Sequence, residues 1–339
     1  MFRRADVELE RIAESFYSKR WVFQLEEDES LPLTCQEALV KRLPHIDPSS
    51  WKERFDLGGV YLAGRPAQLH DVIAPPCRLE YYEPRFDIAK ASQFFPPFSA
   101  EMILRLEDDF GVAVKPAGLP TTASRDQGRF NFQRYLSNHL AESVHTPSRL
   151  DTGVSGLLLF SRSPRMNRAL QKAYEQRRVH KIYLALLSGV CDWRDFDITH
   201  MIDRDDRHPV LRRVVEQGGE SAHTRCTTLC TVGDQSLVLA EPITGRTHQI
   251  RLHCAAEGVP IRGDPYYGGT ADAALHLVSY GIRFFHPFDQ EYKSYLLPRQ
   301  CWPVWLQQLA AHCPEMSERL RELEHEFSSK QKRWGPSTE

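Results

Sequence analysis

The N-terminal part of the chain shows helical spacing of apolar residues followed by a short alternating stretch. Apolar positions predict helices over 34–43 and 48–57, and Asp47 is a suitable N-cap for the second helix. The sequence GGVYLAGRPA that follows predicts a hairpin. Residues 84–102 mix Pro, Ser and Phe without a period and therefore predict a linker.

From residue 103 onward the pattern predicts short strands mixed with helices. It predicts a hairpin at 107–111, strands at 156–161, 181–189, 197–202, 223–231 and 236–241, and helices at 131–141, 164–177 and 247–257. Because strands and helices do not alternate regularly, we expect an α+β fold with a mixed, mostly antiparallel sheet. The period of 305–330 predicts a helical segment that packs outside the core.

These patterns divide the 339 residues into five segments. They are an N-terminal extension (1–33), a small module (34–83), the linker (84–102), a catalytic domain (103–300) and a C-terminal helical extension (301–339). A helix pair followed by a hairpin makes the module similar to the S-four RNA-binding domain of ribosomal proteins. A generic accessory domain is the alternative.

Composition indicates a cytoplasmic protein without a membrane segment. The chain has no run of 18 apolar residues, and its N-terminus carries acids where a signal peptide needs an apolar region. The eight cysteines are scattered without a CxxC pair, which argues against a disulfide framework and a zinc ribbon. Nothing in the sequence indicates a protein partner, so we expect a monomer.

The net charge of −2 hides an uneven distribution. Residues 1–110 carry 14 Lys and Arg against 20 Asp and Glu, whereas residues 125–183 carry 11 against 4. Part of this basic excess lies on the predicted helix 164–177, whose polar face includes Arg165 and Arg168. That face is either solvated or binds phosphate.

One carboxylate lies where a buried strand is expected to begin. In RLDTGVSGLLLFSRS (149–163), Asp151 precedes a continuous apolar run, so it forms either a structural ion pair or a reactive group. In the block GRTHQIR, Gly245 predicts a turn and places Arg246 and Arg251 on the first turns of a helix, one outward and one inward. The two cations and the helix N-terminus would form a site for phosphate or for Asp151.

The motifs RLDTGVSGLLLFSRS, HKIYLALLSG and GRTHQIRLHCAAEGVPIRGDPYYGG, in this order, resemble the RluA-type pseudouridine synthases. AVKPAGLPT at 113–121 and ALHLVSYGIRFFHPF at 274–288 resemble flanking strands of that family, so the resemblance covers about 103–290. Ser148 stands where the family usually has His, and Val154 where it usually has Thr.

The resemblance implies an enzyme that isomerises uridine in structured RNA. It implies that Asp151 acts at the anomeric carbon or the ribose 2′ proton, that Arg251 keeps this carboxylate ionised, and that Tyr183 packs on the base and assists removal of the C5 proton. Taken alone, a tyrosine on an apolar strand such as Tyr183 is more often a core residue. Candidate RNA-binding residues are Arg149, Arg246, Lys181, Arg165 and Arg168. The isomerisation requires no cofactor and no metal.

Other readings stay open at this point. A catalytically inactive RNA-binding protein on the same fold is one alternative. A metal hydrolase could use His248, His253 and Cys254, although the two histidines are five residues apart where helical ligands need three or four. Hydride transfer is disfavoured because no GxGxxG follows a predicted strand. Ribosomal RNA is the favoured substrate if 34–83 binds RNA, and transfer RNA is the alternative.

Overall fold

The computed structural model describes residues 17–26, 33–123, 130–206, 210–269, 272 and 274–328. Residues 1–16 and 27–32 of the predicted N-terminal extension, and 329–339 of the predicted C-terminal extension, lie outside the described residues. No helix within the described ranges is long and apolar enough to cross a membrane.

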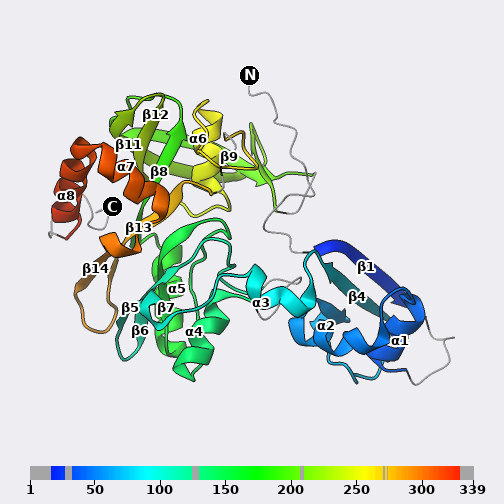
Figure 1. The fold of residues 1–339 in the computed structure, drawn as a ribbon. Helices are drawn as coiled ribbons and strands as arrows, with labels where there is room; N and C mark the ends of the chain where they lie inside the picture. Colours follow the sequence, from blue (N-terminus) through cyan, green and yellow to red (C-terminus); the bar gives the residue numbers. More distant parts are fainter. Residues whose placement is uncertain are drawn as a thin grey trace.

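The N-terminal part forms a four-stranded sheet in the order β1-β4-β2-β3, with a helix pair packed on it (Figure 1). Its elements are β1 (Tyr17–Leu25), α1 (Cys35–Arg42), a 3-10 turn (Pro48–Ser50), α2 (Trp51–Leu57), β2 (Val60–Leu62), β3 (Arg65–Pro66) and β4 (Cys77–Pro84). The helix pair and the hairpin are as predicted, but Asp47 caps the 3-10 turn by accepting from the Ser49 N–H at 2.9 Å, and α2 starts three residues later than the predicted helix. Strand β1 lies in the predicted N-terminal extension but pairs antiparallel with β4, so it belongs to the same sheet.

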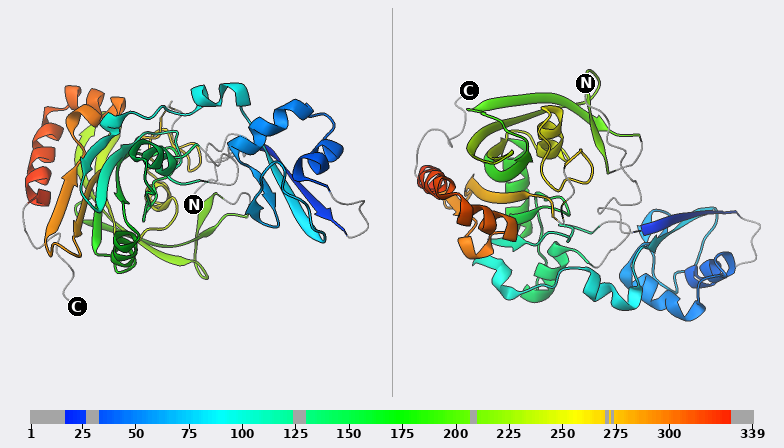
Figure 2. Two further views of the ribbon diagram at one scale, coloured as in Figure 1. Left: turned by 90° about the horizontal axis from the view of Figure 1, so that it is seen from below. Right: turned by 45° about the horizontal axis from the view of Figure 1, so that its top comes forward.

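The chain between the two sheets is folded onto the large domain rather than free. It contains 3-10 turns at Ile88–Lys90 and Ala100–Met102 and the short helix α3 (Ala91–Phe94). Phe95 is buried, and its ring stacks on Phe130 with centroids 4.6 Å apart. Figure 2 shows the small sheet beside the large domain, with this segment between them. Phe95, one of the aromatic residues of this segment without periodic spacing, therefore packs the segment against the large domain.

The large domain is built on a ten-stranded sheet in the order β10-β9-β11-β12-β8-β13-β7-β6-β5, with β14 paired to β13. Its strands are β5 (Ile103–Leu106), β6 (Phe110–Lys115), β7 (Ser155–Ser161), β8 (Val179–Ser188), β9 (Phe196–Arg204), β10 (Arg212–Val215), β11 (Glu220–Val232), β12 (Gln235–Pro242), β13 (Leu277–Phe285) and β14 (Tyr292–Leu296). Strands β13 and β7 pair in parallel and the other described pairs are antiparallel, so the predicted mixed, mostly antiparallel α+β fold is confirmed.

Alternating side chains along the central strands face two different cores. On β8, Ile182 and Leu184 belong to a cluster with α5 (Pro164–Glu175), α7 (Val304–His312) and α8 (Pro314–Ser328). Tyr183 and Ala185 belong to the opposite cluster, with α4 (Phe132–Leu140) and α6 (Gln249–Ala256). The period of two in a strand separates these faces.

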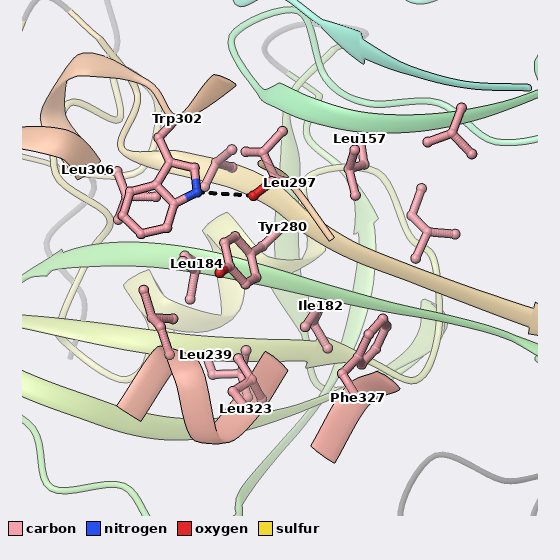
Figure 3. Packing of buried hydrophobic residues seen from close by; sticks show 14 of the residues in the cluster. Leu157, Ile182, Leu184, Leu239, Tyr280, Leu297, Trp302, Leu306, Leu323 and Phe327 are labelled. Carbon is pink, nitrogen blue, oxygen red and sulfur yellow. Dashed lines mark hydrogen bonds between the residues drawn. The ribbon is translucent and has the colours of Figure 1, made fainter. Parts of the chain in front are cut away.

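The C-terminal helices complete the first of these cores, which corrects the prediction that they pack outside it. Leu306, Met316, Leu320 and Phe327 are fully buried. Their side chains lie against Tyr280 and the leucines of the sheet, and the indole N–H of Trp302 donates to the Leu297 carbonyl at 3.1 Å (Figure 3). The spacing of apolar residues predicted the helix α8 correctly. It could not predict where α8 packs, because the strands that bury its apolar face are distant in the sequence.

Candidate active site

A cavity of about 800 Å³ opens on the α4 and α6 side of the large sheet. Its walls come from the loop before β7, the end of α5, the start of β8, strand β10 and the loop that leads into α6. The cavity brings together six of the eight predicted site residues, namely Arg149, Asp151, Lys181, Tyr183, Arg246 and Arg251. Its size is in the range of small-molecule and cofactor sites.

The loop that carries Asp151 is held by backbone contacts. The Lys115 ammonium is fully buried and donates to the carbonyls of Pro116, Leu119 and Thr152 at 2.8, 2.7 and 3.3 Å. Thr121 accepts from the Leu150 N–H and donates to its carbonyl. The loop therefore has little freedom to move Asp151.

Gly156 allows β7 to start directly after this loop. Its φ is +112°, and a Cβ there would lie 2.3 Å from the carbonyl oxygen of Ser279 on β13. Any side chain at this position would separate the two strands at the point where they pair in parallel.

Arg251 connects two carboxylates. It is 1% exposed; its Nε and Nη2 donate to the two oxygens of Asp264 at 2.8 and 2.9 Å, and its Nη1 lies 3.4 Å from Asp151 Oδ2. The guanidinium also lies over the rings of Tyr266 and Tyr267, with centroids 4.7 and 5.3 Å away. The predicted contact between Asp151 and Arg251 is present. The position of the Arg251 guanidinium depends on its two hydrogen bonds to Asp264.

The environment of Asp151 keeps its carboxylate ionised. Burial raises its pKa, but the His248 imidazole and the Arg251 guanidinium outweigh this effect, and the pKa lies below its ordinary value. At neutral pH the acting cations are Arg251 and, to a smaller extent, Lys115, because burial and the neighbouring Arg251 lower the pKa of His248 to about 4.

Tyr183 is both a core residue and part of the cavity wall. It is 6% exposed, it belongs to the cluster around α4 and α6, and it lines the cavity. Burial raises the pKa of its phenol, so the hydroxyl keeps its proton at neutral pH. Ser279 on β13 is the cross-strand partner of Tyr183, and its hydroxyl donates to the Leu157 carbonyl at 2.9 Å.

The predicted RNA-binding cations differ in position. Lys181 lines the cavity half-buried, and burial lowers its pKa to about 8, whereas Arg149 is exposed at the rim. Arg246 lines the cavity and pairs with Glu220 at 2.6 Å. Arg165 and Arg168 lie on the exposed face of α5 and do not line the cavity; Arg165 lies over the ring of Phe288.

The start of α6 differs from the prediction. The helix begins at Gln249, so Arg246 and Thr247 precede it instead of lying on its first turns. His248 adopts the left-handed conformation with φ 58°, and the Gln249 side chain accepts from the Arg246 N–H at 3.0 Å and from Thr244. Of the predicted joint anion site, the contact of Arg251 with Asp151 is present, whereas Arg246 pairs with Glu220 and does not join it.

Several residues of the site were not identified from the sequence. They are Lys115, Arg212, His248 in a non-metal role, Asp264 and Tyr267, and three of them lie in the recognised block 245–269. A buried carboxylate in GDPYYGG, downstream of a buried arginine, was the available signal for Asp264.

The histidines considered for a metal site do not converge. His248 contacts Tyr267, whereas His253 packs against His200 with ring centroids 5.4 Å apart. No group of three or more His, Cys, Asp or Glu side chains among the described residues could hold a metal ion.

Comparisons with known proteins agree with this site. The sequence profile of the RNA pseudouridylate synthase family matches residues 109–256. An RNA pseudouridine synthase of Zymomonas mobilis is 37% identical over 181 residues, which cover 52% of this chain and 82% of the relative. The dual-specificity RNA pseudouridine synthase RluA of Vibrio cholerae is 28% identical over 227 residues, 65% of this chain and 92% of the relative.

A solved structure shows the same fold. The human RNA pseudouridylate synthase domain containing 1 protein superposes with a TM-score of 0.51 at 27% identity, covering 62% of this chain and 88% of that chain. The matched profile contains Asp151, Tyr183 and Arg251. The chain therefore belongs to the RNA pseudouridine synthases of the RluA type, which are RNA-modifying isomerases.

Proposed function

We propose that this enzyme isomerises specific uridines in ribosomal RNA, with transfer RNA as the alternative substrate, and that it works as a cytoplasmic monomer. The observation that carries the assignment is the Asp151 carboxylate, kept ionised by Arg251 at the wall of a cavity lined with cations. The eight cysteines are all free thiols, which fits a reducing compartment.

Asp151 has the chemistry to break the N-glycosidic bond. Its carboxylate attacks the anomeric carbon, or removes the ribose 2′ proton, as the bond to uracil N1 breaks. The uracil then rotates and bonds to the same carbon through C5, and loss of the C5 proton restores the aromatic base. The atoms of uridine are conserved, so the reaction uses no other reactant.

Tyr183 and the surrounding cations would handle the base and the backbone. The Tyr183 ring offers the rotating uracil a flat platform, and its protonated phenol lies in the same wall as Asp151. Arg149 at the rim can occupy the position in the RNA base stack that the flipped uridine vacates. Lys181 and Arg246 would bind phosphates, and Arg165 and Arg168 would contact RNA that flanks the site.

The N-terminal module would select the RNA. The resemblance of its helix pair and hairpin to an S-four domain supports ribosomal RNA as the substrate. Its local charge is not basic enough to bind RNA tightly by counterion release alone, so we propose that it orients the substrate. An inactive RNA-binding protein is the weaker alternative, because Asp151, Tyr183 and Arg251 are all present in one cavity.

The test is a comparison of pseudouridines in total RNA from cells with and without this gene, with the purified protein then added back. Wild type should restore the missing sites. Asp151→Asn should restore none while binding the RNA within a few-fold of wild type, since phosphate contacts supply most of the affinity. Asp197→Asn makes the same change at an exposed position outside the cavity and should behave as wild type. Turnover by Asp151→Asn would refute the assignment.

A further inference from the structure

His248 lies between a buried tyrosine and the Asp151 carboxylate. It is 4% exposed; its Nδ1 is 2.7 Å from the Tyr267 hydroxyl, and its Nε2 is 3.9 Å from Asp151 Oδ2. Its left-handed backbone at the N-cap of α6 turns the ring into the cavity wall instead of along the helix. The chemistry proposed above does not use this side chain.

The hydrogen atoms around Tyr267 determine which nitrogen of His248 carries a proton. The backbone N–H of Arg212 on β10 donates to the Tyr267 hydroxyl oxygen at 3.0 Å. An amide N–H can only donate, so the hydroxyl must direct its own hydrogen elsewhere. Among the residues that the structure describes, His248 Nδ1 is the acceptor available to it. Burial raises the pKa of Tyr267, so the phenol retains this hydrogen.

The His248 ring is uncharged at neutral pH, because burial lowers its pKa to about 4. A neutral imidazole carries a single N–H. Since Nδ1 accepts from Tyr267, this N–H is on Nε2, and it faces Asp151 Oδ2.

His248 and Arg251 then both direct an N–H toward the same oxygen of the carboxylate. Arg251 Nη1 lies 3.4 Å from Oδ2 and His248 Nε2 lies 3.9 Å from it. Among the described residues, the side-chain hydrogen bonds and ion pairs given for the Asp151 carboxylate involve Oδ2. Contacts of this kind are commonly long before substrate binds and shorten in the reacting complex.

We propose that His248 is a positioning residue, held as the Nε2–H tautomer by Tyr267 and Arg212, which together with Arg251 fixes Oδ2 of Asp151 and leaves Oδ1 as the oxygen that reacts with the ribose. This inference rests on the role proposed above for Asp151.

The first experiment compares His248→Asn with His248→Gln by steady-state kinetics on the natural RNA. Asn accepts the left-handed backbone and can still reach Tyr267, but its amide is too short to reach Asp151. The longer Gln brings an amide N–H near the position of Nε2. We expect kcat to fall about 100-fold in the Asn variant with KM within about threefold, and a partial recovery of kcat in the Gln variant.

The pH profile distinguishes positioning from a merely structural role. Arg251, His248 and Lys115 all lower the pKa of Asp151, so removal of the His248 donor should move the acid limb of kcat/KM to higher pH. His286 is buried outside the cavity, and His286→Asn should leave this limb unchanged. Equal losses in the Asn and Gln variants with an unmoved acid limb would overturn the proposal.

The second experiment reads the tautomer directly and needs no activity. In protein labelled with 15N-histidine, the signal lost in His248→Asn should have the nitrogen shifts of an Nε2–H ring, and Tyr267→Phe should shift them toward the other tautomer. An Nδ1–H ring in the wild type would overturn the proposal. Absence of uridine isomerisation by the wild type would instead refute the proposed function, so the two failures are distinguishable.

Discussion

Replacing Asp264 by Asn should destabilise the large domain strongly, because it leaves a buried guanidinium without its main partner. The Asp264 side chain is fully buried and accepts from Arg251 Nε and Nη2 and from the Tyr266 N–H. Asparagine keeps one acceptor oxygen but places an NH₂ group opposite an N–H donor of Arg251. Arg251 would keep its contact of 3.4 Å to Asp151 but would lose the carboxylate charge and one of its two hydrogen bonds to residue 264.

The magnitude follows from the burial of both partners. Removal of one member of a buried ion pair typically costs about 3–5 kcal/mol. A domain of this size loses roughly 2–4 °C in Tm for each kcal/mol, so we expect a decrease of about 6–20 °C. Scanning calorimetry of the full chain measures this decrease.

Asp197→Asn is the matched control for this prediction. Its carboxylate also pairs with an arginine, Arg225, at 3.2 Å, but the Asp197 side chain is 45% exposed. Exposed pairs contribute about 0–1 kcal/mol, so its Tm should fall by less than about 4 °C. Equal shifts in the two variants would refute the view that Arg251 depends on Asp264.

Three further outcomes are expected. The pH profile should show kcat/KM constant from neutral into the acid range, because the pKa of Asp151 lies below its usual range. KM should rise above about pH 8 as Lys181 loses its charge, and Lys181→Arg should abolish that rise. Deletion of residues 1–84 should leave a monodisperse domain, by size-exclusion chromatography, that isomerises a short stem-loop but binds its natural RNA more weakly. Deletion through residue 100 also removes Phe95 and should cause aggregation. Phe327→Ala should cost about 3–5 kcal/mol in calorimetry while kcat and KM stay at wild-type values, because its side chain packs on the opposite face of the sheet.

Much of the large domain could be predicted because its signals are local. Helix α5 starts at Pro164, as predicted for the helix 164–177, and the Ser163 hydroxyl caps it by accepting from the Met166 N–H at 3.1 Å. Strands β10 and β14 were not predicted: they are short and half-exposed, so their residues show no strong apolar pattern. Strand β1 was missed because its pairing partner β4 lies far along the chain.

In the candidate site, too, some residues could be identified from the sequence and others only from the structure. Resemblance identified Asp151, Tyr183 and Arg251, and the structure places them in one cavity. The dependence of Arg251 on Asp264 could not be read from the sequence, because it requires the turn at Gly263 that brings the two side chains together. With φ +72° and a Cβ position 1.8 Å from the Ala274 carbonyl oxygen, Gly263 admits no other residue without rearrangement of that turn.

The alternation along β8 restricts how this enzyme can change. Tyr183 faces the cavity, whereas Ile182 and Leu184 face the C-terminal helices. A strand has a side-chain period of two, so insertion or deletion of one residue within β8 would exchange these environments and present a leucine to the RNA. Substitutions on the helix side alter stability alone and can accumulate independently of the chemistry. The number of residues in β8 is therefore more tightly constrained than the identity of the residues on its helix-facing side.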